Sequence, residues 1–257
     1  MKTVSFQYQT ELRFSSPASA HSFLLRILPQ SDNRQRIKKI SWHIDPSGTE
    51  WRTSDNFGNE VLSGYIEAPH EYFSFGVQGT ADVLSEPYTI CNEPKHILLY
   101  PTRLTSGLGD FYSKLEHSAP SNALQRIEYF SHAVHTHLRY ERGITASSTT
   151  AQEAFNLGAG VCQDYSHILL ALLRQSAIPC RYIAGFASDY GETHAWVEAW
   201  IADRFYGIDP TRDKFIDEGY VAISRGRDFD DCSVERGVFK GACRGTLAIN
   251  LKMEISQ

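Results

Sequence analysis

The sequence predicts an α+β protein in which an antiparallel β-sandwich, over residues 1–105, precedes a region of helices and strands, over residues 106–257. Three observations lead to this expectation. Short alternating apolar segments separated by turn residues fill the first hundred positions. Apolar residues at helical spacing come next, and three strand-like segments follow the last long helix. At 257 residues, the chain has room for one large domain or two modest ones.

The N-terminal half contains short segments typical of strands at residues 23–28, 39–44, 72–77 and 80–84. Clusters of Asp, Asn, Pro and Gly at 45–48 and 55–59 separate them, as turns do. Short strands with regular turn punctuation are typical of an antiparallel sandwich. No nucleophile, base and orienting residue come together in this half.

The middle of the chain predicts three helices. Residues 100–120 are rich in Pro and Gly and indicate a linker around a short helix. Ser121 is placed to cap a helix running to 139, and Thr150 to start one through 157. After the Gly158-Ala159-Gly160 break, a wide apolar stripe predicts a helix over 162–175.

Three strands follow this helix, at residues 181–187, 193–201 and 204–208. The second and third are separated only by a tight turn at 202–203, which predicts a hairpin. Asp209-Pro210 ends the third strand. The order helix, strand, strand, strand indicates an α+β arrangement for this half.

Composition excludes several classes of protein. Hydrophobic residues make up 42% and charged residues 21% of the chain, as in ordinary soluble domains that need no metal or disulfide to fold. The net charge of −5 argues against a nucleic-acid-binding protein, which usually has a basic face. The longest apolar run, residues 168–173, is too short to cross a bilayer, so no membrane association is expected.

The five cysteines, Cys91, Cys162, Cys180, Cys232 and Cys243, are odd in number, widely spaced and form no CxxC pair. They therefore predict neither a disulfide framework nor a zinc knuckle. Because the N-terminus also lacks the apolar run of a signal peptide, we expect a reducing, cytoplasmic location in which a free thiol survives.

Cys162 is the candidate nucleophile. It follows Gly160-Val161 and opens the helix predicted over 162–175. The N-terminus of a helix carries unpaired N–H groups and a partial positive charge, which favour a thiolate and can hold a developing oxyanion. Taken alone, the same cysteine is equally well explained as a small buried residue.

His194 and Asp209 are the candidate base and orienting carboxylate. They lie at the start of one hairpin strand and at the end of its antiparallel partner, so the fold brings them close together. Each residue alone has a structural explanation, as a core histidine or as the cap of the Asp-Pro turn. Together with Cys162, in this order, they favour a catalytic triad.

The motifs around these residues resemble those of bacterial transglutaminase-like proteins, often described as cysteine proteases: GVCQDYSH (160–167), IPCRY (178–182), HAWVE (194–198) and GIDPT (207–211). GRDFDD (226–231) and RGVFKG (236–241) also resemble that family, and DNFGN (55–59) resembles part of its β-rich N-terminal domain. The chain departs from the usual pattern at Ala159 and Cys180, neither of which is a triad position.

This resemblance implies a papain-like, transglutaminase-like catalytic core over 106–257, with Cys162 as nucleophile, His194 as general base and acid, and Asp209 as orienter. The expected reaction is attack on an amide of a peptide or protein substrate, through a thioester that passes to water or to an amine. We expect hydrolysis to be favoured, because water needs no dedicated acceptor site. No cofactor is expected, and the sequence does not identify a second oxyanion donor or an oligomeric state.

Two other functions stay open. A peptide-binding module on the same fold would keep the groove without catalysis. A metal-dependent hydrolase would use His132 and His135, which share a helical face, although no nearby Cys or paired carboxylate completes a ligand set. Asp164 is expected to have a structural role in the first turn of its helix, and Trp196 either shields the thiolate pair from water or packs the core.

Overall fold

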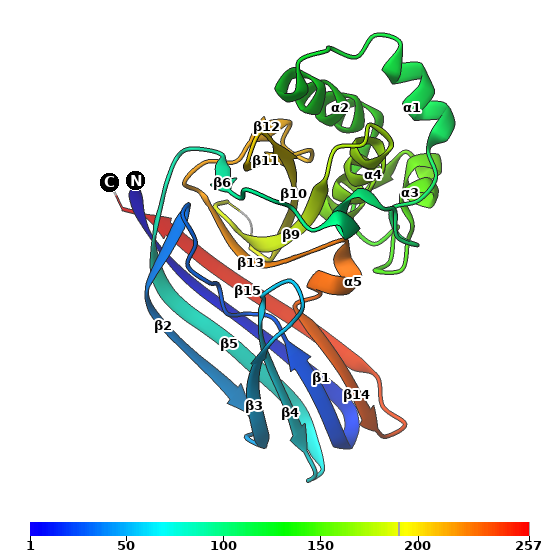
Figure 1. The fold of residues 1–257 in the computed structure, drawn as a ribbon. Coiled ribbons are helices and arrows are strands. Elements are labelled where there is room, and N and C mark those ends of the chain that lie inside the picture. Colours follow the sequence, from blue (N-terminus) through cyan, green and yellow to red (C-terminus); the bar gives the residue numbers. More distant parts are fainter. Residues whose placement is uncertain (190, 257) are drawn as a thin grey trace.

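The long first strand, β1 (Lys2–Leu25), belongs to both layers of an N-terminal β-sandwich (Figure 1). The structure is a computed structural model that describes residues 1–189 and 191–256. The first half of β1 lies between β5 and β15, and its second half between β4 and β14. β2 extends the first layer beyond β5, and β3 extends the second beyond β4. The bounds are β2 (Gln35–Asp45), β3 (Thr49–Ser54), β4 (Glu60–Ile66), β5 (His70–Val83), β14 (Glu235–Lys240) and β15 (Gly245–Ile255).

A bend in β1 allows its two halves to pair in different layers of the sandwich. Its pairing with β5 runs to Arg13 and then jumps to Ala18, and the left-handed backbone of Ala20 (φ 47°) lies within the bend. Aromatic rings fill the space between the layers, with Phe23 of the second half of β1 5.0 Å from Phe73 of β5 between ring centroids. The α+β class and the β-rich N-terminal region predicted from the sequence are thus confirmed.

The last two strands correct the predicted division of the chain. Residues 106–257 were expected to form one region, but β14 and β15 pair with β1 in the sandwich. The β15 register extends from Val4↔Ile255 to Phe14↔Gly245, so the end of the chain is built into the N-terminal layer. Strand pairing joins segments that lie far apart in the sequence, and the residues of one strand do not indicate which sheet it will join.

The second sheet is antiparallel, in the order β12-β11-β10-β9-β13, with β6 beside β11. The predicted hairpin is confirmed, and Ala202 and Asp203 at its turn both have positive φ, as the strand twist requires of a two-residue turn. The bounds are β6 (Tyr88–Ile90), β9 (Cys180–Ala187), β10 (His194–Ile201), β11 (Arg204–Asp209), β12 (Lys214–Phe215) and β13 (Tyr220–Gly226).

Helix α4 (Cys162–Gln175) packs on β9 and β10 and on helices α2 and α3, and its predicted bounds are confirmed. Ile168, Leu169, Leu172 and Leu173 are fully buried, and each contributes about 1.5–3 kcal/mol by leaving water. The remaining elements are the 3₁₀ helix η1 (His96–Leu99), the helices α1 (Gly109–Glu116), α2 (Ala123–His137), α3 (Ala151–Leu157) and α5 (Phe229–Cys232), and the short parallel pair β7 (Arg139–Tyr140) and β8 (Ala159–Gly160).

Two helix starts test the capping predictions. Thr150 caps α3 as predicted, in a capping box with Glu153. The start predicted for α2 was wrong by one residue, because Asn122, not Ser121, caps it by accepting a hydrogen bond from the Gln125 N–H at 3.1 Å. Asn and Ser are equally good caps, so propensity alone could not choose between adjacent positions.

Two amide side chains of the sandwich bind the backbone of β13, the outer strand of the second sheet. Gln35 exchanges two hydrogen bonds of 2.8 Å with Ala222, and Asn59 exchanges two of 2.7 Å with Arg225. Asp55 holds Asn59 in place by accepting from its backbone and side-chain N–H groups, which gives the DNFGN turn a structural purpose. Each amide takes the place of a neighbouring strand along this edge.

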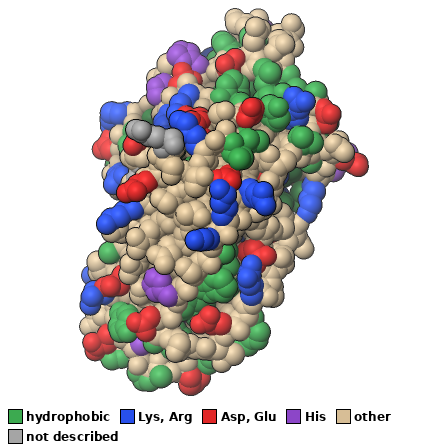
Figure 2. All heavy atoms as spheres, turned by 90° about the vertical axis from the view of Figure 1, so that its left-hand side faces the viewer, with side chains coloured by type: hydrophobic (Ala, Val, Ile, Leu, Met, Phe, Trp, Pro, Cys, Tyr) green, Lys and Arg blue, Asp and Glu red, His purple; other side chains and the backbone are tan. Residues whose placement is uncertain are grey.

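The face seen in Figure 2 has Lys and Arg side chains interspersed with Asp and Glu. Among the described residues, no helix is both long enough and apolar enough to span a membrane.

Replacing Gln35 by Ala is expected to lower the free energy of unfolding by about 2–4 kcal/mol, because a buried N–H and a buried C=O of Ala222 lose their partners. Urea unfolding followed by circular dichroism measures the change. Gln78→Ala is the matched control, since Gln78 is exposed on the outer face of β5 and should change stability by less than about 0.5 kcal/mol. Equal effects of the two variants would contradict the proposed bracing of β13.

Candidate active site

Cys162 is the first residue of α4, and the turn before it is fixed by Asp164. The Asp164 carboxylate accepts hydrogen bonds from the Val161 N–H (2.7 Å) and the Thr145 hydroxyl (2.8 Å). Gly160 permits this approach, since a Cβ there would lie 2.5 Å from a carboxylate oxygen of Asp164. Burial raises the pKa of Asp164. The structural role expected for Asp164 is therefore what the contacts support.

His194 and Asp209 meet at the open end of the β10–β11 hairpin. The imidazole Nε2 lies 2.7 Å from the Asp209 Oδ2, and both side chains are wholly buried. Antiparallel pairing aligns the start of β10 with the end of β11, as the sequence predicted. The structure thus brings these two candidate residues into direct hydrogen-bond contact.

Three further donors hold the Asp209 carboxylate. The Tyr220 hydroxyl donates to Oδ2 at 2.8 Å, and the backbone N–H groups of Thr211 and Arg212 donate to Oδ1 at 2.9 and 3.3 Å. Burial alone would raise the pKa of Asp209, but the hydrogen bond and charge of His194, with smaller contributions from Tyr220 and Arg212, bring it below its ordinary value. The carboxylate is therefore ionised at neutral pH.

Tyr220 is a site residue that sequence reasoning missed. It lies on β13, eleven residues after Asp209 in the chain, and its ring stands 6.3 Å from the His194 ring. No motif or spacing pointed to it, since only the pairing of β13 with β9 brings it beside the carboxylate. Its role is visible only in the folded chain.

The imidazole is held in its charged form. Burial would lower the pKa of His194, but the hydrogen bond with Asp209 and the interaction with Cys162 raise it to about 9. Because Nε2 is engaged by Asp209, the nitrogen that remains for the Cys162 thiol is Nδ1. The charged imidazole and the N-terminus of α4 thus face the same cleft as the sulfur.

Cys162 and His194 both line an open cleft of about 320 Å³. Tyr140 and Arg142, here called the rim residues, also line it, and Arg142 forms an ion pair with Glu192, another lining residue. Tyr182 and Phe229 also line the cleft. A carbonyl carbon in this cleft would be accessible to the sulfur and the imidazole together, as nucleophilic catalysis requires.

Trp196 lies outside the cleft and packs behind the imidazole. It is fully buried, with its ring 5.4 Å from Tyr220 and 6.5 Å from His194. Gly185 leaves room for it, since a Cβ there would lie 2.4 Å from the indole. Of the two roles left open by the sequence, its position supports packing.

The histidines of α2 do not assemble a metal site. His132 lies 2.6 Å from an Asp213 oxygen, and His137 stacks on Phe155 at 3.9 Å. In the part of the chain that the structure describes, no group of three or more His, Cys, Asp or Glu side chains is arranged to hold a metal ion. Asp228 caps the short helix α5, and Asp231 braces it by accepting a hydrogen bond from the Arg227 N–H.

Two parts of the chain match known protein families. Residues 113–210, which include Cys162, His194 and Asp209, match the transglutaminase-like superfamily, and residues 4–82 match the bacterial transglutaminase-like N-terminal region. An uncharacterised protein of Mycobacterium leprae is 26% identical over 278 residues, covering 97% of each chain. One of Mycobacterium tuberculosis is 25% identical over 268 residues, covering 90% of this chain and 85% of the relative.

A solved structure from Cytophaga hutchinsonii, whose name as a cysteine protease is provisional, superposes with a TM-score of 0.84. It covers 100% of this chain and 92% of its own at 22% identity, so it shows a shared fold. The chain therefore belongs to the transglutaminase-like superfamily and carries the bacterial transglutaminase-like N-terminal region in front of its core.

Proposed function

We propose that this protein is a cysteine-dependent enzyme that cleaves amide bonds of peptides or proteins through a thioester, with hydrolysis favoured over transfer to an amine. One observation carries the proposal: a thiol at a helix N-terminus shares an open cleft with an imidazole that a buried carboxylate orients. A peptide-binding module would have no use for a buried histidine–aspartate pair beside a thiol.

The reaction follows from the positions of these groups. The Cys162 thiolate attacks the amide carbon, and the C–N bond breaks as His194 gives its Nδ1 proton to the leaving amine. The thioester that forms is attacked by water, whose proton returns to His194. The tetrahedral intermediate then collapses, releasing the carboxylic acid and restoring the thiolate. With an amine in place of water, the same steps give a new amide.

Tyr140 is our candidate for the second oxyanion donor. β7 pairs in parallel with β8, with Tyr140 opposite Gly160, which brings the phenol to the cleft beside Cys162. The Arg142 guanidinium interacts with the phenol and can only donate, so the phenolic O–H remains available for a bound carbonyl. Burial raises the pKa of Tyr140, which keeps it a donor.

Other polar side chains near Cys162 are less suited to this role. The Gln163 amide donates to the Ser147 carbonyl at 3.1 Å, and the Trp196 indole is buried outside the cleft. The first donor would be the backbone N–H of Cys162 itself, at the start of α4. Sequence reasoning left the second donor unassigned, because Tyr140 precedes Cys162 by more than twenty residues.

The direct test is turnover of peptide and glutamine-amide substrates with and without an added primary amine. We expect the wild-type protein to cleave amides and release the amine or ammonia, with little incorporation of the added amine, and Cys162→Ala to lose all of this activity. Mass spectrometry should detect an acyl adduct on Cys162. Undiminished turnover by Cys162→Ala would reject the thioester mechanism, and dominant amine incorporation would reject the preference for water.

The pH profile tests the imidazolium. Since the pKa of His194 is raised to about 9, activity should be retained through neutral pH and lost as pH rises through about 9, where the acid for the leaving amine disappears. Asp209→Asn removes a contact that raises this pKa, so the alkaline limb should move to lower pH and kcat should fall by about 10²–10⁴. Asp213→Asn, outside the cleft, is the control and should leave the profile unchanged. If the alkaline limb of the pH profile did not move in Asp209→Asn, the assignment of that limb to His194 would be contradicted.

Tyr140→Phe separates oxyanion binding from thiolate reactivity. We expect kcat/KM for amide cleavage to fall by about 10²–10³, the usual cost of removing one oxyanion donor. Alkylation of Cys162 by iodoacetamide should keep its wild-type rate, because that displacement forms no oxyanion. Tyr100→Phe, at an exposed position, is the matched control. Parallel loss of both reactions would mean that Tyr140 acts on the thiol and not on the oxyanion.

A further inference from the structure

A second hollow, of about 690 Å³, lies directly beside the catalytic cleft. Most of its lining residues come from β1, β4 and β14 of the second sandwich layer, which we call its floor, and from α5, which we call its wall. Figure 1 shows α5 at the end of β14 that is nearer the second sheet. We call this hollow the docking groove, and its lining includes Ser22, Leu24, Ser63, Ser147, Phe229 and Val238.

The docking groove is continuous with the cleft. Phe229 lines both hollows, and the consecutive residues Val234 and Glu235 line the cleft and the groove respectively. Gln163, the neighbour of Cys162, also donates a hydrogen bond to the carbonyl of Ser147 in the groove wall. A chain that enters the cleft can therefore pass directly over Phe229 into the groove.

The floor of the groove presents apolar side chains to solvent. Val238 on β14 is 72% exposed and lies opposite Ser22, on the same face of the sheet. On the next row, Leu24 pairs with Ser63, and Ser63 pairs with Trp51, which is 54% exposed. Directly paired residues point to the same side of a sheet, so these side chains form one apolar surface dotted with serine hydroxyls.

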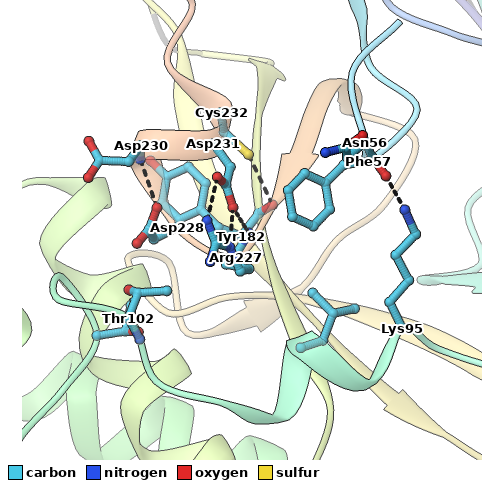
Figure 3. A network of polar contacts seen from close by, with 12 residues as sticks. Asn56, Phe57, Lys95, Thr102, Tyr182, Arg227, Asp228, Asp230, Asp231 and Cys232 are labelled. Atoms are coloured by element: carbon cyan, nitrogen blue, oxygen red, sulfur yellow. Dashed lines mark hydrogen bonds and ion pairs between the residues drawn. The ribbon is translucent and has the colours of Figure 1, made fainter.

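Hydrogen bonds and ion pairs connect the wall to its neighbours. Arg227 donates to the Asp231 carboxylate at 2.8 Å, and Cys232 bonds the Tyr182 carbonyl, which ties α5 to β9 (Figure 3). The Asp230 side chain points away from this network and forms an ion pair with Arg236 at 3.2 Å (Figure 3). These contacts hold α5 against its neighbours.

The charged side chain of β14 on the groove side is Arg236. It pairs with Leu24 across the sheet and therefore shares the face of Ser22 and Val238, whereas Glu235 pairs with the buried Leu25 and points to the opposite face. Arg236 is engaged with Asp230 of the wall. The exposed part of the floor therefore offers mainly apolar contacts to a bound chain.

We propose that the docking groove binds an extended segment of a polypeptide substrate, adjacent to the amide held at Cys162. This inference rests on the proposed function and narrows its substrate class to polypeptides. A small amide would need only the cleft, whereas the groove offers apolar contacts and hydroxyls along a second, larger hollow. Apolar surface with few convergent polar groups is what binding sites usually present.

The test compares two exposed aliphatic positions on neighbouring strands. Val238→Arg places a long charged side chain on the groove floor, and Leu247→Arg makes the same change on β15, outside the groove lining. Both are measured in the Cys162→Ala background for binding of fluorescein-labelled β-casein. With Cys162 intact, both are measured for kcat/KM on β-casein and on carbobenzoxy-glutaminyl-glycine.

Val238→Arg is expected to weaken β-casein binding and lower kcat/KM for β-casein by about tenfold, while Leu247→Arg matches the wild type. Turnover of the dipeptide should be unchanged in both variants. An unchanged ratio of β-casein to dipeptide turnover in Val238→Arg would overturn the groove assignment while leaving the proposed function intact. Absence of all turnover in the wild type would instead reject the proposed function, and the binding arm would still decide the groove.

A second copy of this chain is the rival occupant. Sedimentation of the wild type and of Val238→Arg distinguishes it. A monomeric wild type supports substrate docking, and a dimer that Val238→Arg dissociates would overturn it.

Discussion

The buried contact between the His194 imidazolium and the Asp209 carboxylate is the interaction on which the catalytic half of the molecule depends. Moving two such charges out of water costs several kcal/mol for each ion, and the contact persists only because other groups compensate them. Asp209 receives the Tyr220 hydroxyl and two backbone N–H groups in addition to the imidazole. Strand β13, the hairpin and the turn after β11 must therefore all be in place before the pair can form.

This dependence extends into the sandwich. Tyr220 lies at the start of β13, and Arg34 donates a hydrogen bond to its carbonyl while Gln35 holds Ala222 two residues further on. Asn59 binds the same strand at Arg225. We infer that the sandwich braces the strand that supplies the tyrosine beside Asp209. Because β14 and β15 close the sandwich from the other end of the chain, this brace is complete only when the whole chain has folded.

Helix α4 both anchors the site in the core and places Cys162 at the cleft. Its buried stripe anchors it in the core, while its first residue stands at the mouth of the cleft. The hydrogen bond from the Val161 N–H to Asp164 fixes the turn before Cys162, and Gly160 leaves room for that carboxylate. The Cys162 backbone N–H stands at the start of the helix, where a helix supplies no i−4 partner. The rim residues Tyr140 and Arg142 come from β7 and the loop after it, and β7 is held to the same turn by its pairing with β8. The thiol, its charge environment and the candidate oxyanion donors thus share one local scaffold.

The sequence by itself determined the elements whose signals are local. The apolar stripe predicted α4 to the residue, Thr150 predicted the start of α3, and the tight turn at 202–203 predicted the hairpin that brings His194 to Asp209. Only the tertiary structure decided that β14 and β15 join the sandwich, that Tyr220 reaches Asp209, that Tyr140 lines the cleft and that Trp196 packs behind the imidazole. The physical reason is the distance along the chain over which each interaction acts. Capping, periodicity and turn conformation involve residues a few positions apart. Strand pairing and buried polar contacts join residues far apart in the sequence, and the residues around each partner do not indicate which partner it will meet.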